Sequence, residues 1–158
     1  VAERGAMFNP GPCVYMEKIA VGPEAANAID LNVSPTKNLK EVAKAMKKSL
    51  SELTVMILER DRHNDLIAEV RSTGARIRLI TDGDIFAAIA AASSEVGVDV
   101  LMDIGGTPEG VVAAIFLAGN RSPMTQSAGL LVRPIAAEHG SRGAPAPCAT
   151  RPAPRRSA

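Results

Sequence analysis

The chain has 158 residues, enough for one domain of ordinary size, and 46% of them are hydrophobic while 22% are charged, as is typical of a globular protein. Aromatic residues make up only 3% and tryptophan is absent, which disfavours recognition of nucleic-acid bases by stacking. The formal net charge is +1, and no apolar run is long enough to cross a membrane.

The first part of the chain is predicted to be extended. Residues 13–22, CVYMEKIAVG, form a candidate strand bounded by turn residues, and residues 28–33, AIDLNV, form a short second one. Apolar side chains then recur at helical spacing over residues 39–48, which predicts a helix with Asn38 as its N-cap.

Strands and helices are expected to alternate from residue 53 onward. The apolar patterns predict strands at 53–59, 75–80 and 98–104 and helices at 63–74, 82–94 and 107–119. Short connections and continuous apolar strands are typical of right-handed βαβ crossovers and of a parallel sheet covered on both faces. The predicted fold class is therefore α/β, with alternating layers of βαβ units.

Residues 121–158 differ in character from residues 1–120. They carry six arginines, one glutamate and no lysine, and they end in a Pro/Ala/Arg tract. We expect a disordered tail, arising as a natural linker or from a shifted reading frame. The arginines suggest non-specific nucleic-acid binding as an alternative, although a solvated tail is the simpler interpretation.

A polar cluster follows each of the three alternating strands. Because ligands bind beyond the carboxyl ends of strands in a parallel sheet, the three clusters should converge on one edge. The clusters are Arg60-Asp61-Arg62-His63, Thr81-Asp82-Gly83-Asp84 and Gly105-Gly106-Thr107-Pro108-Glu109.

The third cluster suits an anion site. Two glycines let backbone amides approach a ligand, and a helix that starts after them, with Thr107 as N-cap, offers its positive end. The alternative is a plain strand-to-helix turn in which Glu109 favours the helix dipole. Glu109 is also a candidate ligand for Mg²⁺ or Mn²⁺, because these ions prefer carboxylates.

The other two clusters also have two interpretations. Arg60 and Arg62 could hold a phosphate in forked hydrogen bonds, or they could lie in a solvated turn. Asp82 and Asp84 could accept hydrogen bonds from sugar hydroxyls or hold a metal, or Asp84 could simply cap the next helix. His63 is too isolated in the sequence to be proposed as a ligand.

Together with YMEK and TDGD, the stretch DIGGTPEG resembles the class II fructose-1,6-bisphosphatases of bacteria over residues 1–119. The resemblance implies a partial sugar-phosphatase fold similar to the inositol-phosphatase superfamily. It also implies hydrolysis of the 1-phosphate of fructose-1,6-bisphosphate with Mn²⁺ or Mg²⁺, and in some lineages use of sedoheptulose-1,7-bisphosphate. A cytoplasmic enzyme of gluconeogenesis that assembles into homo-oligomers, with no specific nucleic-acid or membrane partner, is expected.

The resemblance also implies roles for particular residues. Arg60-Asp61 stands where many relatives have Lys/Arg-Pro, which weakens the case for Asp61. The implied metal ligand is Glu109, and the implied substrate contacts are Tyr15, Arg60, Asp61, Arg62, Asp82, Gly83, Asp84 and Gly106.

The resemblance covers the C-terminal half of such enzymes. The N-terminal half carries most of the metal-binding carboxylates, including a DPxEGT-type motif that does not occur in this sequence. We therefore expect residues 1–120 to form the substrate side of a bisphosphatase, with little or no activity alone. A non-catalytic sugar-phosphate-binding module is the first alternative, and a basic-tailed nucleic-acid binder is the second.

Overall fold

A computed structural model describes residues 13–93, 96–119 and 128–135. The 3-10 turns within these residues are η1 (Pro23–Ala25), η2 (Leu50–Glu52) and η3 (Asp61–His63). The strands and helices are β1 (Tyr15–Val21), α1 (Pro35–Ala45), β2 (Thr54–Leu58), α2 (Asn64–Ser72), β3 (Arg76–Ile80), α3 (Asp84–Ala92), β4 (Val100–Gly106), α4 (Thr107–Gly119) and β5 (Gly129–Ile135).

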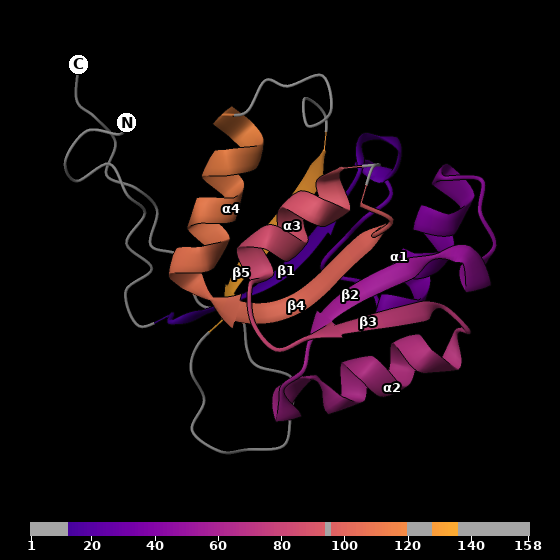
Figure 1. The fold of residues 1–158 in the computed structure, drawn as a ribbon, viewed down its shortest axis with the longest axis horizontal. Helices are drawn as coiled ribbons and strands as arrows, with labels where there is room; N and C mark the ends of the chain where they lie inside the picture. Colours follow the sequence, from indigo (N-terminus) through magenta and orange to yellow (C-terminus); the bar gives the residue numbers. More distant parts are fainter. Residues whose placement is uncertain (1–12, 94–95, 120–127, 136–158) are drawn as a thin grey trace.

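The described strands form one five-stranded sheet in the order β3-β2-β4-β1-β5 (Figure 1). β2 runs parallel to β3 and β4, whereas β1 runs antiparallel to both β4 and β5. The predicted α/β class is confirmed, and the sheet is mixed where an all-parallel one was expected. Because β1 is antiparallel to β4, its first residue, Tyr15, lies opposite Gly106 at the end of β4.

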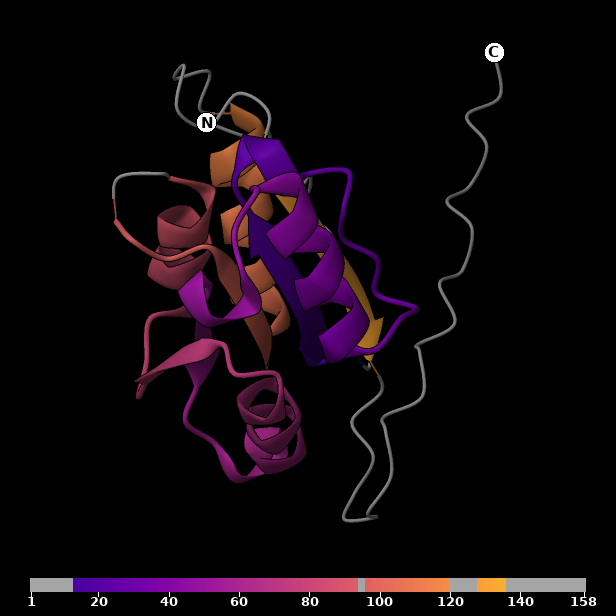
Figure 2. The same cartoon turned by 90° about the vertical axis from the view of Figure 1, so that its right-hand side faces the viewer.

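Helices cover both faces of the sheet (Figures 1 and 2). Side chains of α1 and α2 pack on one face against alternate residues of β1 and β4, including Ile19 and Met102. α3 and α4 pack on the other face, where Ala20 and Leu101 belong to a second apolar cluster. Within the described residues, no helix is both long and apolar enough to span a membrane.

The predicted strand over residues 28–33 is wrong, since these residues form a loop. The carboxylate of Asp30 accepts a hydrogen bond from the Asn32 amide (2.8 Å), and this local bond competes with strand pairing. The Asn38 side chain accepts from the Asp30 amide (2.8 Å) and donates to its carbonyl (2.9 Å). Asn38 therefore braces the loop from inside α1. Its predicted role as N-cap is wrong, because the helix starts earlier and Ser34 is the N-cap.

The segment expected to be a disordered tail contributes a strand. Within residues 121–158, Gly129–Ile135 form β5 along the free edge of β1, and Arg133 on it pairs with Glu17. Residues 121–127 and 136–158, which include the Pro/Ala/Arg tract, lie outside the described residues.

Candidate functional site

The predicted polar clusters meet at the edge of the sheet where β2, β3 and β4 end. The reversed direction of β1 brings Tyr15 to the same edge, beside Gly106. Arg62 donates from Nε to the Ile104 carbonyl (2.8 Å), and its guanidinium carbon lies 5.2 Å from the centre of the Tyr15 ring. Three residues assigned to substrate by resemblance, from three separate stretches of the chain, thus lie together.

Other predicted contacts sit at the rim of this edge. Arg60 donates to the carbonyls of Thr81 (2.6 Å) and Glu59 (3.0 Å), so it ties the loop after β2 to the loop after β3. Asp61 is exposed at the start of η3, and Asp82 is exposed with one carboxylate oxygen accepting from the Gly83 amide (2.8 Å). Their predicted roles in substrate binding stay predictions.

Asp84 does not cap α3. Gly83 occupies the N-cap position with a left-handed backbone (φ 91°), and Asp84 is the first residue of the helix. Its carboxylate turns inward and forms an ion pair and hydrogen bond with the ammonium of Lys18. The capping alternative for Asp84 is therefore wrong.

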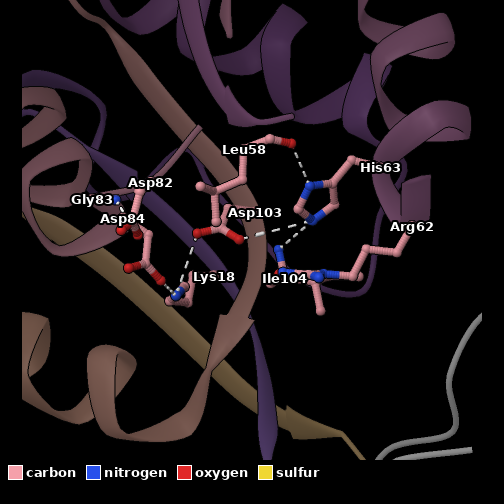
Figure 3. A network of polar contacts seen from close by, with 9 residues as sticks. All are labelled: Lys18, Leu58, Arg62, His63, Asp82, Gly83, Asp84, Asp103 and Ile104. Carbon is pink, nitrogen blue, oxygen red and sulfur yellow. Dashed lines mark hydrogen bonds and ion pairs between the residues drawn. The ribbon is translucent and has the colours of Figure 1, made fainter. Parts of the chain in front are cut away.

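A buried polar cluster lies behind this contact (Figure 3). The register of β1 and β4 places Lys18 directly opposite Asp103, and Lys18 Nζ lies 3.3 Å from a carboxylate oxygen of Asp103. Lys18 is 1% exposed and Asp103 is 2% exposed. Sequence reasoning missed both residues, although a charge within an otherwise apolar strand was a usable signal, because buried charges require partners.

Burial dominates the protonation of Asp103. Desolvation raises the pKa of its carboxyl to about 6, against the opposing effect of the Lys18 charge. By geometric criteria neither carboxylate oxygen accepts a hydrogen bond from the described residues, although the ammonium of Lys18 lies within ion-pair range. The carboxyl therefore has unused acceptor capacity in a dry environment.

His63 closes the other side of the cluster as a neutral side chain. Its Nδ1 hydrogen-bonds to the Leu58 carbonyl (2.6 Å), and its Nε2 accepts from the Ile104 amide (2.9 Å), so the proton sits on Nδ1. Burial lowers the pKa of His63. The 3.8 Å distance between Nε2 and Asp103 is therefore not an ion pair, and His63 joins β2 to β4.

The start of α4 differs in one respect from expectation. Thr107 is the first residue of the helix, and its hydroxyl donates to the Cys13 carbonyl (2.7 Å), so the predicted capping role is wrong. Glu109 folds back over Gly106, where an added Cβ would lie 2.0 Å from its Oε2. Gly106 is thus required for this placement of the carboxylate.

Glu109 fits one position in the coordination of a divalent metal. Its Oε2 is buried and has no hydrogen-bond partner among the described residues, and a carboxylate oxygen suits Mn²⁺ or Mg²⁺. The described part of the chain contains no group of three or more His, Cys, Asp or Glu side chains that could hold a metal ion. The described residues therefore do not form a complete metal site, and a role for Glu109 as a ligand stays a prediction.

Comparison with known proteins settles the family. The profile described as "Bacterial fructose-1,6-bisphosphatase, glpX-encoded" matches residues 1–127. The chain belongs to this family. The resemblance inferred from the sequence motifs is thereby confirmed, and the family is one of fructose-bisphosphatases.

Curated relatives match over most of this chain but only part of their own. One is the D-fructose 1,6-bisphosphatase class 2/sedoheptulose 1,7-bisphosphatase 2 of Acaryochloris marina, 46% identical over 114 residues, or 72% of this chain and 32% of that protein. The bisphosphatases of Thermosynechococcus vestitus (45%) and a Synechococcus strain (43%) match 72% and 74% of this chain and 33% of their own lengths. The chain spans about a third of the length of these relatives.

Proposed function

We propose that the chain forms the substrate side of an enzyme that hydrolyses the 1-phosphate of fructose-1,6-bisphosphate with Mn²⁺ or Mg²⁺. The observation that carries the proposal is the meeting of Tyr15, Arg62 and Gly106 at one edge of the sheet, next to the unpartnered Oε2 of Glu109. The family and the names of the relatives support the sugar bisphosphate as substrate.

The chain's own residues divide the work between phosphate and sugar. Arg62 is exposed and uses Nε on Ile104, which orients its remaining guanidinium donors beside Tyr15 for a phosphate group. Glu109 would hold the metal, which when bound neutralises charge that develops on the transferring phosphate. The exposed turn at Asp82 and Gly83 would contact the sugar, with the Asp82 carboxylate accepting hydrogen bonds from its hydroxyls.

The isolated chain is proposed to have little or no phosphatase activity. A two-metal site needs several carboxylates, and the described residues contain no group of three or more His, Cys, Asp or Glu side chains that could hold a metal ion. Within a complete enzyme, the same edge would serve gluconeogenesis in the cytoplasm.

Phosphate release and equilibrium dialysis test this function together. We expect no phosphate release from fructose-1,6-bisphosphate by the chain, but binding that Mn²⁺ strengthens and that Glu109→Gln makes insensitive to Mn²⁺. Equal affinity with and without Mn²⁺ would instead favour the non-catalytic sugar-phosphate-binding module. Mn²⁺-dependent phosphate release that is lost in Glu109→Gln would overturn the proposed inactivity.

A further inference from the structure

Lys18 is a charged residue in the buried interior, where a charge costs free energy unless it has partners. Its ammonium is buried at 1% exposure and lies between the carboxylates of Asp84 and Asp103. A lysine so placed cannot reach a bound substrate, and an uncompensated charge there would be strongly unfavourable. Whatever Lys18 does for ligand binding must therefore act through the groups it contacts.

Gly105 leaves the space in which Lys18 and Asp84 meet. An added Cβ on Gly105 would lie 2.4 Å from the Asp84 carboxylate and 2.5 Å from Lys18 Nζ. Gly105 pairs with Met16 in the same antiparallel ladder that sets Lys18 opposite Asp103. The meeting of ammonium and carboxylate thus depends on a glycine that the substrate assignments do not include.

Asp84 transmits this contact to the surface. It follows Gly83, whose left-handed backbone (φ 91°) ends the turn before α3. Asp82 and Gly83 are exposed, whereas Asp84 is buried and held by Lys18. The inward carboxylate therefore anchors a turn whose exposed members face the site edge.

We propose that Lys18 is a positioning residue, which fixes the turn of Asp82, Gly83 and Asp84 through its ion pair with Asp84 while Asp103 holds its ammonium from the other side. The inference rests on the proposed function, because it deepens the role of that turn in binding a sugar phosphate. Lys18 acts through Asp84 and contacts no ligand.

A double-mutant cycle on fructose-1,6-bisphosphate affinity tests the proposal by equilibrium dialysis. Lys18→Met should weaken binding about tenfold. Asp84→Asn and the double variant should each give the same loss, because every one of these variants breaks the same Lys18–Asp84 ion pair. Lys37→Met, an exposed lysine on α1, is the matched control and should leave affinity unchanged. Losses that multiply in the double variant would overturn the proposal, since independent effects are additive in free energy.

If Lys18→Met does not fold, Asp103→Asn provides a second test of the proposal. It is isosteric, and it leaves the Lys18 ammonium paired with one carboxylate, that of Asp84. Affinity should fall by about threefold, less than in Lys18→Met, because the ammonium loses one of its two holders. Unchanged affinity in this variant would contradict a role for Asp103 in holding Lys18.

A ligand-free measurement separates this inference from the proposed function. The ¹³C resonance of the Asp84 carboxyl carbon should move and broaden in Lys18→Met and stay in place in Lys37→Met. If the unmodified chain binds no fructose-1,6-bisphosphate but this change is seen, the proposed function fails while the positioning of Asp84 stands. An unmoved Asp84 resonance would overturn the positioning itself.

Discussion

Burial in the fold strongly changes the protonation of Asp103. Desolvation raises its pKa from 3.8 to about 6, while the neighbouring Lys18 charge opposes the rise and Asp84 adds to it. The folded state therefore binds the proton of Asp103 more tightly than the unfolded state does. This contribution to stability is complete below pH 3.8 and is lost as the pH rises through about 6.

Replacement of Asp103 by asparagine should remove this pH dependence. A pKa change from 3.8 to about 6 corresponds to roughly 3 kcal/mol, so Asp103→Asn should gain up to about that much free energy of unfolding over the unmodified chain above pH 7. The two proteins should converge near pH 4 in urea titrations. His63 contributes with the opposite sign because burial lowers its pKa, but it is present in both proteins and its effect largely cancels. A constant difference from pH 4.5 to 8 would contradict the assignment.

Gly106 leaves the space that the Glu109 carboxylate occupies. An added Cβ would lie 2.0 Å from Glu109 Oε2, so Gly106→Ala should displace the carboxylate from its buried position. We expect Gly106→Ala to behave like Glu109→Gln, with binding of fructose-1,6-bisphosphate that no longer responds to Mn²⁺. Dialysis with and without Mn²⁺ measures this, and a full Mn²⁺ response in Gly106→Ala would show that the displaced carboxylate is not the ligand.

At the scale of elements, the loop over residues 28–33 depends on one side chain of the following helix. Asn38 is buried and makes hydrogen bonds to both backbone groups of Asp30. Asn38→Ala should cost about 1–3 kcal/mol of unfolding free energy, because two part-buried hydrogen bonds to the Asp30 backbone are lost, each worth about 0.5–1.5 kcal/mol. Asn64→Ala, at the exposed start of α2, is the control and should cost well under 1 kcal/mol in thermal unfolding. Equal costs would contradict the bracing role of Asn38.

The sequence predicted the alternating elements from residue 53 onward because their apolar periods are long and their connections short. It did not predict that β1 runs antiparallel to β4, since a local pattern carries no strand direction. β5 was missed because Arg133 and Pro134 interrupt its apolar run. Both residues are acceptable there because β5 lies at the edge of the described sheet, where proline is tolerated.

The candidate site was predictable in part for a physical reason. Loops after parallel strands must share an edge, so the clusters containing Arg62, Asp84 and Glu109 were placed together correctly. Tyr15 required the family resemblance, because its position depends on the direction of β1. Lys18 and Asp103 could not be paired beforehand, since their contact depends on the register between two strands far apart in sequence.

At the scale of the whole molecule, apolar side chains remain exposed on the two helices that cover one face. Phe86 on α3 is 62% exposed and Ile115 on α4 is 55% exposed. We expect the chain to self-associate through these helices, with sedimentation velocity showing concentration-dependent oligomers that Phe86→Lys and Ile115→Lys reduce. Val96→Lys, at an exposed valine outside both helices, should change little. Monomeric behaviour at all concentrations would contradict the expected homo-oligomer.

We propose that the edge where β1 begins and β4 ends binds a sugar bisphosphate. A titration of the ¹⁵N-labelled chain with fructose-1,6-bisphosphate, followed by ¹H–¹⁵N correlation spectra, tests it most directly. The largest amide changes should fall on Tyr15, Arg62, Gly83 and Gly106, and added Mn²⁺ should broaden the amide of Glu109. Changes confined to the opposite end of the sheet, or none at millimolar ligand, would contradict the claim.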